Sequence, residues 1–351
     1  MPGNYFDFFV QWHLTERCNL HCRHCYQRVV VPEMDCAEIC QAIDDIKSTF
    51  DSWVTEHKMA VSPSFHFTGG EPLLRNDLMD ILEYVRDYGY ATALMSNGTL
   101  ITDDAARQLR QVQVKEVQVS IDGLEAVHDA IRGRGSFQRA LRGIEKLLAQ
   151  GIDTSINFTL SRLNIGEVDG LVRLAEERGI GSVTFSRLVS CGRGSALGSE
   201  MLTPPELAAF YSRVPGYQAG SKVVFASRDP LLTVAGLTDE VADVEFPVGG
   251  CAAGVFGITI AADGSIMPCR RMDLSIGNIR ESSLREVWAD SPVLWSLRNR
   301  DEYDGSCRSC YYWPVCRGCR AIALAFARSA GKEDYLGPDP QCSYYREAKY
   351  G

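Results

Sequence analysis

The chain has 351 residues, of which 45% are hydrophobic and 23% charged, as in an ordinary globular protein with a substantial core. Its 36 basic and 45 acidic residues give a net charge of −9, which argues against a broad surface for nucleic acids or anionic membranes. The N-terminus lacks the basic and apolar regions of a signal peptide, and no apolar run approaches the ~18 residues of a membrane span. We therefore expect a cytoplasmic protein without nucleic-acid or membrane partners.

From the N-terminus to about residue 190, strand-like and helix-like segments alternate. The strand-like segments are 5–14, 62–70, 90–98, 116–123, 154–162 and 182–189. The helix-like segments between them are 35–57, 76–89, 102–113, 136–151 and 166–179. This alternation implies an α/β fold with a parallel sheet and right-handed crossovers. Because six units are too few for a closed eight-unit barrel, we expect a partial, open (β/α)6 TIM-like barrel. A doubly wound sheet is the alternative fold.

The pattern changes after a Gly- and Ser-rich joint at 191–200. A capped helix is expected over 203–214, and the segment 257–269 predicts a β-hairpin that turns at Asp263-Gly264. The sequence thus predicts three parts. They are a barrel core over 1–195, a bridging region over 196–248, and a smaller Cys-rich α+β domain over 249–351.

Thirteen cysteines are unusual for a chain expected in a reducing compartment, where grouped cysteines indicate metal or cluster ligation rather than disulfides. The first group, Cys18, Cys22 and Cys25, has the spacing C-x3-C-x2-C directly after the first strand. One interpretation is a zinc site completed by a neighbouring histidine. The other is a [4Fe–4S] cluster with one iron that no cysteine binds.

The cysteine spacing after the first strand resembles the signature of the radical S-adenosylmethionine (SAM) enzymes. Further motifs of that family follow in the same order at the next three strand ends: "GGEP" at 69–72, "MSNG" at 95–98 and "SIDG" at 120–123. Ligands of open α/β sheets bind at these carboxyl ends. The resemblance implies that the three cysteines hold a cluster whose free iron binds SAM. Reductive cleavage then yields a 5′-deoxyadenosyl radical that abstracts a substrate hydrogen.

The resemblance also implies a set of contacts to SAM, in which His24 takes the position of an aromatic that packs against adenine. An exposed arginine at a helix start is the alternative interpretation of Arg132. No catalytic base can be chosen. The residues expected at SAM are His24, Gly69, Gly70, Glu71, Pro72, Ser96, Asn97, Ser120, Asp122, Arg132, Asn157 and Leu188.

The cysteines after residue 249 resemble the SPASM extension of the same enzymes, which holds two auxiliary iron–sulfur clusters. The resemblance assigns four of them to the outer cluster, Cys307, Cys310, Cys316 and Cys342, and three to the inner one, Cys251, Cys269 and Cys319. "CRGC" at 316–319 has two residues between its cysteines where the family has three, so the geometry at Cys319 departs from the pattern. A zinc-stabilised extension is the alternative.

The inner set lacks a fourth cysteine, so an open iron or a ligand from elsewhere, such as Cys191, is expected there. Cys191 lies just past the sixth strand, near the expected mouth of the barrel. Cys36 and Cys40 lie four residues apart on one face of a predicted helix and are interpreted as buried thiols.

The resemblance predicts a radical SAM oxidoreductase or maturase with SAM and three [4Fe–4S] clusters as cofactors. Enzymes with this extension most often modify ribosomally made peptides or proteins, so peptide modification or crosslinking is the expected function. A haem precursor or small metabolite is the alternative substrate. A non-catalytic iron–sulfur electron carrier is a further alternative, although a carrier would not need the motifs at the strand ends.

Two partners are expected besides the substrate. The resemblance implies an external electron donor of flavodoxin or ferredoxin type. Because 17 residues precede Cys18, we expect no fused leader-binding domain. Three arrangements agree with this expectation: a separate protein binds the leader of the peptide, the enzyme recognises the peptide directly, or the substrate is not a peptide.

Overall fold

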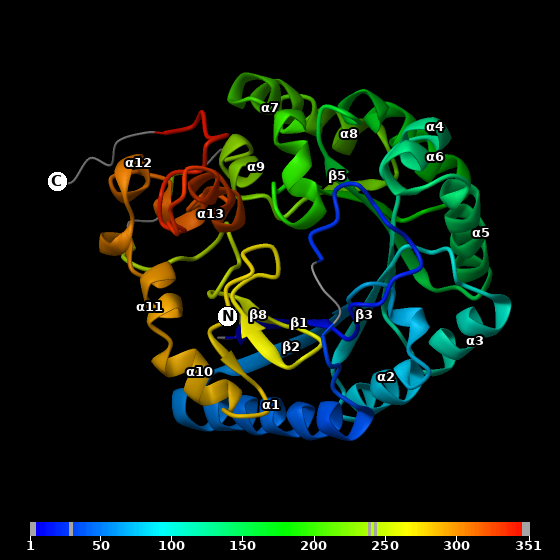
Figure 1. Ribbon diagram of the computed structural model, residues 1–351, viewed down its shortest axis with the longest axis horizontal. Helices are drawn as coiled ribbons and strands as arrows, with labels where there is room; N and C mark the ends of the chain where they lie inside the picture. The colour runs from blue at the N-terminus through cyan, green and yellow to red at the C-terminus, as the bar shows by residue number, and fades with distance from the viewer. Residues whose placement is uncertain (1–4, 28–30, 238–239, 242–243, 346–351) are drawn as a thin grey trace.

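The computed structural model describes residues 5–27, 31–237, 240–241 and 244–345. Its strands form one ten-stranded sheet in the order β10-β9-β8-β1-β2-β3-β4-β5-β6-β7. Seven consecutive strands are parallel: β1 (Tyr5–His13), β2 (Ala60–Thr68), β3 (Ala91–Ser96), β4 (Glu116–Ser120), β5 (Asp153–Leu160), β6 (Ser182–Arg187) and β7 (Val224–Ala226). Figure 1 shows this sheet curving inside an outer layer of helices.

The helices of the barrel connect successive strands on the outside of the sheet. They are α1 (Cys36–His57), α2 (Leu78–Asp87), α3 (Asp103–Gln111), α4 (Glu125–Arg132), α5 (Ser136–Ala149) and α6 (Val168–Arg178). Local sequence sets their ends: Asp35 and Glu38 form a capping box at the start of α1, and Gly179 ends α6 with a φ of +69°. The expected partial barrel is confirmed.

The doubly wound alternative is wrong, because β1 to β7 follow one another in the sheet without the reversal of strand order that defines a doubly wound fold. The structure also adds β7 from the bridging region, for which the sequence predicted only a helix. That region contains α7 (Pro204–Tyr211), α8 (Val214–Gly220) and α9 (Pro230–Ala235).

The C-terminal region adds strands to the other edge of the barrel sheet. The expected hairpin is confirmed as β8 (Gly257–Ile260) and β9 (Ser265–Met267), and β10 (Gly277–Asn278) pairs with β9. β8 runs parallel to β1, and a Cβ on Gly257 would lie 2.1 Å from the Phe9 carbonyl oxygen. The Cys-rich region therefore continues the sheet of the core.

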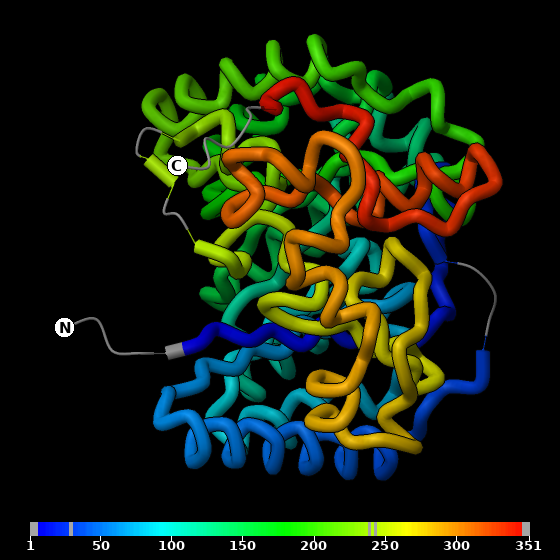
Figure 2. The backbone as a smooth tube through the Cα atoms, turned by 90° about the vertical axis from the view of Figure 1, so that its left-hand side faces the viewer, coloured from blue at the N-terminus to red at the C-terminus, as the bar shows by residue number. Residues whose placement is uncertain are grey.

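The remaining helices are short: α10 (Leu284–Asp290), α11 (Pro292–Arg298), α12 (Gly305–Arg308) and α13 (Arg320–Ser329). The 3₁₀ segments are η1 (Pro72–Leu74), η2 (Ile165–Glu167), η3 (Gly192–Glu200), η4 (Arg300–Glu302) and η5 (Trp313–Val315). Figures 1 and 2 show the C-terminal segments, in orange and red, lying across the open side of the barrel between α1 and α7. In the described part of the chain, no helix has the length and apolar character that a membrane span requires.

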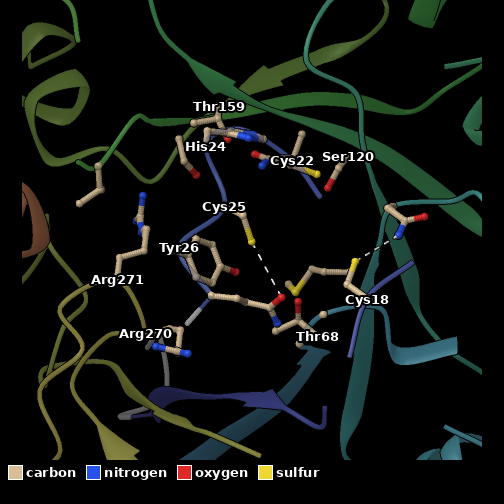
Figure 3. Close-up of a pocket in the computed structure, with 18 of the residues that line it drawn as sticks. Cys18, Cys22, His24, Cys25, Tyr26, Thr68, Ser120, Thr159, Arg270 and Arg271 are labelled. Atoms are coloured by element: carbon tan, nitrogen blue, oxygen red, sulfur yellow. Dashed lines mark hydrogen bonds between the residues drawn. The ribbon is translucent and has the colours of Figure 1, made fainter. Parts of the chain in front are cut away.

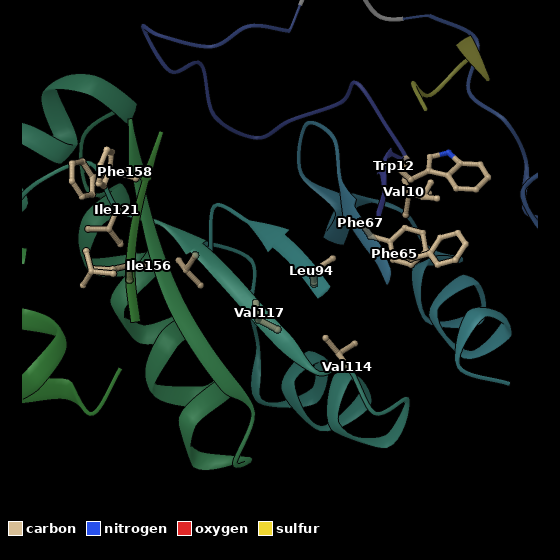
Figure 4. Packing of buried hydrophobic residues seen from close by; sticks show 14 of the residues in the cluster. Val10, Trp12, Phe65, Phe67, Leu94, Val114, Val117, Ile121, Ile156 and Phe158 are labelled. Carbon is tan, nitrogen blue, oxygen red and sulfur yellow. The ribbon is translucent and has the colours of Figure 1, made fainter. Parts of the chain in front are cut away.

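The two faces of the sheet have different characters because side chains alternate along a strand. Toward the helices, the strands bury apolar residues such as Val10, Phe67, Leu94, Val117 and Ile156, several of which Figure 4 shows. The residues that alternate with them line an internal cavity; they include Gln11, Met95, Gln118, Asn157 and Ser186. Because side chains alternate along each strand, the apolar core lies on the helix side of the sheet and the cavity lies on its inner side.

Candidate active site

The cavity has a volume of about 300 Å³ and lies at the carboxyl ends of the parallel strands. Thr68, Ser96 and Ser120, the last residues of β2, β3 and β4, line it together with Ser186 and Arg187 at the end of β6. Figure 3 shows the loop after β1 entering this space with Cys18, Cys22 and Cys25. The position agrees with the rule that open α/β sheets bind ligands at their carboxyl edge.

The glycines of "GGEP" hold the cysteine loop against the end of β2. Gly70 N–H donates to the Thr15 carbonyl at 2.6 Å, and Glu71 N–H donates to the Arg17 carbonyl at 2.8 Å. A Cβ on Gly69 would lie 2.3 Å from Thr15 O, and one on Gly70 would lie 1.9 Å from Arg17 O. Only glycine permits so close an approach between the two backbones.

Two of the three cysteines, Cys18 and Cys22, have donor groups close to their sulfurs. Asn97 Nδ2 lies 3.9 Å from Cys18 Sγ, and Arg132 Nη1 lies 3.8 Å from Cys22 Sγ. Burial raises the pKa of the Cys18 and Cys22 thiols, whereas nearby Arg132 acts in the opposite direction on Cys22. Three thiols from one loop, facing a cavity beside hydrogen-bond donors, fit a [4Fe–4S] cluster that cysteine binds at three irons.

Most of the residues expected at SAM line this cavity: His24, Gly69, Gly70, Ser96, Asn97, Ser120, Arg132, Asn157 and Leu188. Glu71, Pro72 and Asp122 are buried and are not among the lining residues. The structure therefore brings the motifs of four strand ends together, but it places these three behind the cavity wall.

Glu71 connects the ends of β2 and β3 from below the cavity. Its carboxylate accepts hydrogen bonds from Ser96 Oγ at 2.8 Å and from the Asn97 backbone N–H at 2.8 Å. Burial raises the pKa of Glu71 to about 7, although these hydrogen bonds act against the shift. Glu71 thus fixes the backbone that carries Ser96 and Asn97.

Asp122 has a similar supporting position behind two cavity residues. Its Oδ2 accepts a hydrogen bond from Arg132 Nε at 2.5 Å and lies 3.0 Å from His24 Nε2, while Oδ1 accepts from the Thr159 N–H at 2.7 Å. Burial alone would raise the pKa of Asp122, but the Arg132 charge and His24 hold it well below its usual value. Because only 11% of the Arg132 side chain is exposed, the interpretation of Arg132 as a surface arginine is wrong.

The C-terminal region supplies the other wall of the cavity. Cys269, Arg270 and Arg271 line it, and Figure 3 shows both arginines beside Tyr26, across from Cys18. No sequence motif indicated these two arginines, although their position directly after a predicted cluster ligand was a usable signal. Arg187, at the end of β6, was likewise not predicted.

Arg187 joins three parts of the chain beneath the cavity. Its guanidinium pairs with Asp229, which caps α9, at 2.6 Å, and with Asp339 near the C-terminus at 2.7 Å. Gln341 Oε1 accepts a further hydrogen bond at 2.8 Å. Burial opposes the charge of Arg187, but the two carboxylates keep its pKa far above the usual value.

The four cysteines predicted for an outer auxiliary cluster line one small pocket of about 20 Å³, together with Trp313 and Asp339; they are Cys307, Cys310, Cys316 and Cys342. The Gly318 N–H donates to Cys316 Sγ at 3.3 Å. Within the described residues, no three Cys, His, Asp or Glu side chains converge on a site for a single metal ion. A four-iron cluster distributes its ligands over four metal atoms.

The three cysteines predicted for an inner cluster pack around one apolar group that includes Val189, Ala253 and Met272; they are Cys251, Cys269 and Cys319. Cys191 packs against the same group. The short spacing in "CRGC" is accommodated by two consecutive left-handed residues, Arg317 and Gly318, both with a φ of 62°. Cys319 therefore reaches the group of Cys251 and Cys269 despite the missing residue.

Cys36 and Cys40 are not the buried thiols that the sequence predicted. Both are partly exposed, and they interact with each other in the first turns of α1, where the helix begins at the rim of the core. Neither residue lines the cavity or the pocket of the outer cysteines.

Family models and curated relatives match most of the chain. A model of the radical SAM superfamily matches residues 12–175, and the model of SPASM, an iron–sulfur cluster-binding domain, matches residues 251–311. The AdoMet-dependent heme synthase of Methanosarcina barkeri is 32% identical over 95% of this chain and 96% of its own length. The mycofactocin maturase MftC of Mycobacterium ulcerans is 28% identical over 95% of this chain and 87% of its own.

Solved structures share the fold at low sequence identity. Streptococcus suis SuiB bound to S-adenosylmethionine matches with a TM-score of 0.74 and 18% identity, over 96% of this chain and 77% of SuiB. The structure of anSMEcpe with bound AdoMet matches with a TM-score of 0.73 and 19% identity, over 96% of this chain and 91% of the other.

Proposed function

The chain belongs to the radical SAM superfamily and carries a SPASM iron–sulfur domain, and from this premise we propose that it removes hydrogen from a tetrapyrrole of the haem-precursor class. The observation that carries the substrate class is the identity of 30–32%, over 95–97% of this chain, with relatives named AdoMet-dependent heme synthases. The arginine-rich lining of the cavity supports an anionic substrate of this kind.

In this proposal, Cys18, Cys22 and Cys25 hold the [4Fe–4S] cluster, which would accept SAM at its remaining iron. When bound, the reduced cluster would supply one electron for the cleavage of SAM, and SAM would supply the radical that removes the substrate hydrogen. The chain holds the reactants in place and excludes water. The Gly69–Gly70 backbone fixes the cysteine loop, and Arg132 presents its charge from the cavity wall.

Asp122 positions the two residues proposed to flank SAM. It orients Arg132 toward a carboxylate and holds His24, the residue proposed to pack against adenine, through the contact with Nε2. Two further clusters are proposed, at the outer and the inner cysteine sets of the SPASM region.

A ribosomally made peptide is the second candidate substrate, supported by the similarity to relatives named mycofactocin maturases. Under either proposal an external flavodoxin- or ferredoxin-type donor supplies the electron. A separate leader-binding protein belongs to the peptide proposal alone.

The experiment is anaerobic incubation of the reconstituted protein with SAM, a reductant and iron coproporphyrin III, followed by mass spectrometry. We expect 5′-deoxyadenosine to accumulate together with a change in the mass of the porphyrin, and we expect neither with Cys22→Ala. Cys36→Ala, outside the cavity, is the matched control. Formation of 5′-deoxyadenosine with an unchanged porphyrin would reject the substrate class and favour the peptide. Absence of 5′-deoxyadenosine would favour an electron carrier.

A further inference from the structure

Two buried hydrogen-bond donors in the cavity wall have no partner. Gln27 and Arg270 are 8% and 6% exposed, and both line the cavity. Gln27 Nε2 and Arg270 Nε make no hydrogen bond, whereas Gln27 Oε1 accepts one from Cys25 Sγ at 3.9 Å, drawn as the dashed line from Cys25 in Figure 3. Buried donors are normally satisfied, so these two N–H groups indicate that an acceptor binds here.

The charges of the cavity point to an anionic acceptor. Its lining includes Arg132, Arg187, Arg270 and Arg271 and, among the described residues, no Asp or Glu. Arg132 and Arg187 are neutralised from behind by Asp122 and by the pair of Asp229 and Asp339, respectively.

The two arginines of the C-terminal wall differ in their ion pairs. Arg270 contacts Glu16 at 3.2 Å and Asp273 at 3.3 Å through its terminal nitrogens. No ion pair to Arg271 occurs in the described ranges; its Nη1 donates to the Arg187 carbonyl at 3.4 Å. The Arg271 side chain also hydrogen-bonds the sulfur of Cys269. Among the described residues, Arg271 is therefore a partly buried cation without a carboxylate partner.

These donors lie at one end of the cavity. Tyr26, which precedes Gln27, lies within electrostatic range of both Arg270 and Arg271, and Figure 3 shows its ring beside them. The strand ends proposed to bind SAM, including Ser120, lie across the cavity. Tyr26 thus brings the adjacent Gln27 to the wall of the cavity that carries Arg270 and Arg271.

We propose that Gln27, Arg270 and Arg271 form a subsite for a carboxylate of the substrate. Arg271 supplies the charge, while Arg270 Nε and Gln27 Nε2 supply directed hydrogen bonds to the two oxygens. The inference rests on the proposed function, in which a propionate side chain of the tetrapyrrole occupies the subsite.

The test measures the binding of two probes to the reconstituted protein by anaerobic equilibrium dialysis. The probes are iron coproporphyrin III and its tetra-amide, which lacks the carboxylates. We expect wild type to bind the acid about tenfold more tightly than the amide, as a charge-assisted pair requires. Arg271→Gln and Gln27→Leu should each reduce this preference, Arg271→Lys should restore part of it, and Arg139→Gln, on the exposed face of α5, should match wild type.

Four results would overturn the subsite. Equal affinity for acid and amide in wild type would reject carboxylate recognition while leaving the tetrapyrrole substrate standing. An equal loss of SAM affinity in Arg271→Gln would place the SAM carboxylate here instead. If Arg271→Gln keeps the preference for the acid but shifts the reduction potential of the auxiliary clusters, Arg271 acts on the cluster ligand Cys269 and not on the substrate. If neither probe binds wild type, the proposed function fails together with the subsite. Iron content and thermal unfolding of each variant verify folding.

Discussion

Asp122 shows how a side chain outside the cavity controls two inside it. The sequence motif predicted direct contact with SAM, whereas the structure has its carboxylate bonded to Arg132, His24 and the Thr159 backbone. A residue's place in a motif identifies the strand end but not whether the side chain faces the ligand or its neighbours. This difference depends on packing that short motifs do not encode.

Asp122→Asn should therefore weaken SAM binding without removing a contact to SAM itself. Loss of the buried charge leaves Arg132 unpaired, which we expect to destabilise the fold by about 3 kcal/mol. Calorimetry should show a SAM affinity at least about tenfold lower, as expected when a positioning ion pair is lost. Asp103→Asn, at an exposed site of α3, is the control, and an unaltered SAM affinity in Asp122→Asn would contradict the account.

Glu71 makes the stability dependent on pH. Burial raises its pKa from 4.5 to about 7, so the folded chain binds a proton that the unfolded chain has released in this interval. Stability from this group is fully present below about pH 4.5 and decreases as the pH rises to about 7, by roughly 3 kcal/mol in total. Relative to Glu71→Gln, wild type should lose thermal stability between pH 5 and pH 8. A constant difference in melting temperature would refute this.

At the scale of elements, the junction between β2 and the cysteine loop depends on Gly70. A Cβ there would lie 1.9 Å from a backbone oxygen, which cannot move without moving the loop. Gly70→Ala should therefore lower the iron content by about one cluster, roughly four irons per chain, without affecting the auxiliary clusters proposed for the C-terminal region. Gly166→Ala, where no atom lies within 4 Å of the added Cβ, is the control. A full complement of iron in Gly70→Ala would show that the close approach is not required.

The elements themselves were largely predictable. The period-two pattern of the strands and the caps of the helices located β1 to β6 and their helices, because these signals are local. The pairing of β8 with β1 was not predictable, since it joins residues about 250 positions apart through the backbone. β7 has three residues, too few to produce a periodic pattern.

In the candidate site, too, local sequence signals were predictable and contacts between distant residues were not. The outer cysteines could be grouped from the sequence, since Cys307, Cys310 and Cys316 are neighbours in the chain and Cys342 follows the order of the family that the chain resembles. These four cysteines line one pocket. Arg187, Arg270 and Arg271 were missed, because their importance depends on whether the fold places carboxylates beside them, as it does for Arg187 and Arg270.

At the scale of the whole molecule, Arg187 couples the barrel to the C-terminal region. Arg187→Met would leave Asp229 and Asp339 buried without their cation, at a cost of about 3–5 kcal/mol. Because Asp339 also accepts the Cys319 N–H at 2.8 Å, the inner cysteine set should loosen with it. We expect a lower melting temperature and altered electron paramagnetic resonance of the auxiliary clusters. A spectrum and stability equal to those of wild type would argue against this coupling.

The most direct test of the account is whether the reduced protein cleaves SAM at the cavity of the cysteine loop. Reconstituted wild type and the triple variant Cys18→Ala/Cys22→Ala/Cys25→Ala are incubated with SAM and dithionite, and 5′-deoxyadenosine is quantified by mass spectrometry. We expect 5′-deoxyadenosine from wild type and none above background from the triple variant, whose auxiliary cysteines are intact. Equal amounts from the two proteins, or none from a fully reconstituted wild type, would contradict it.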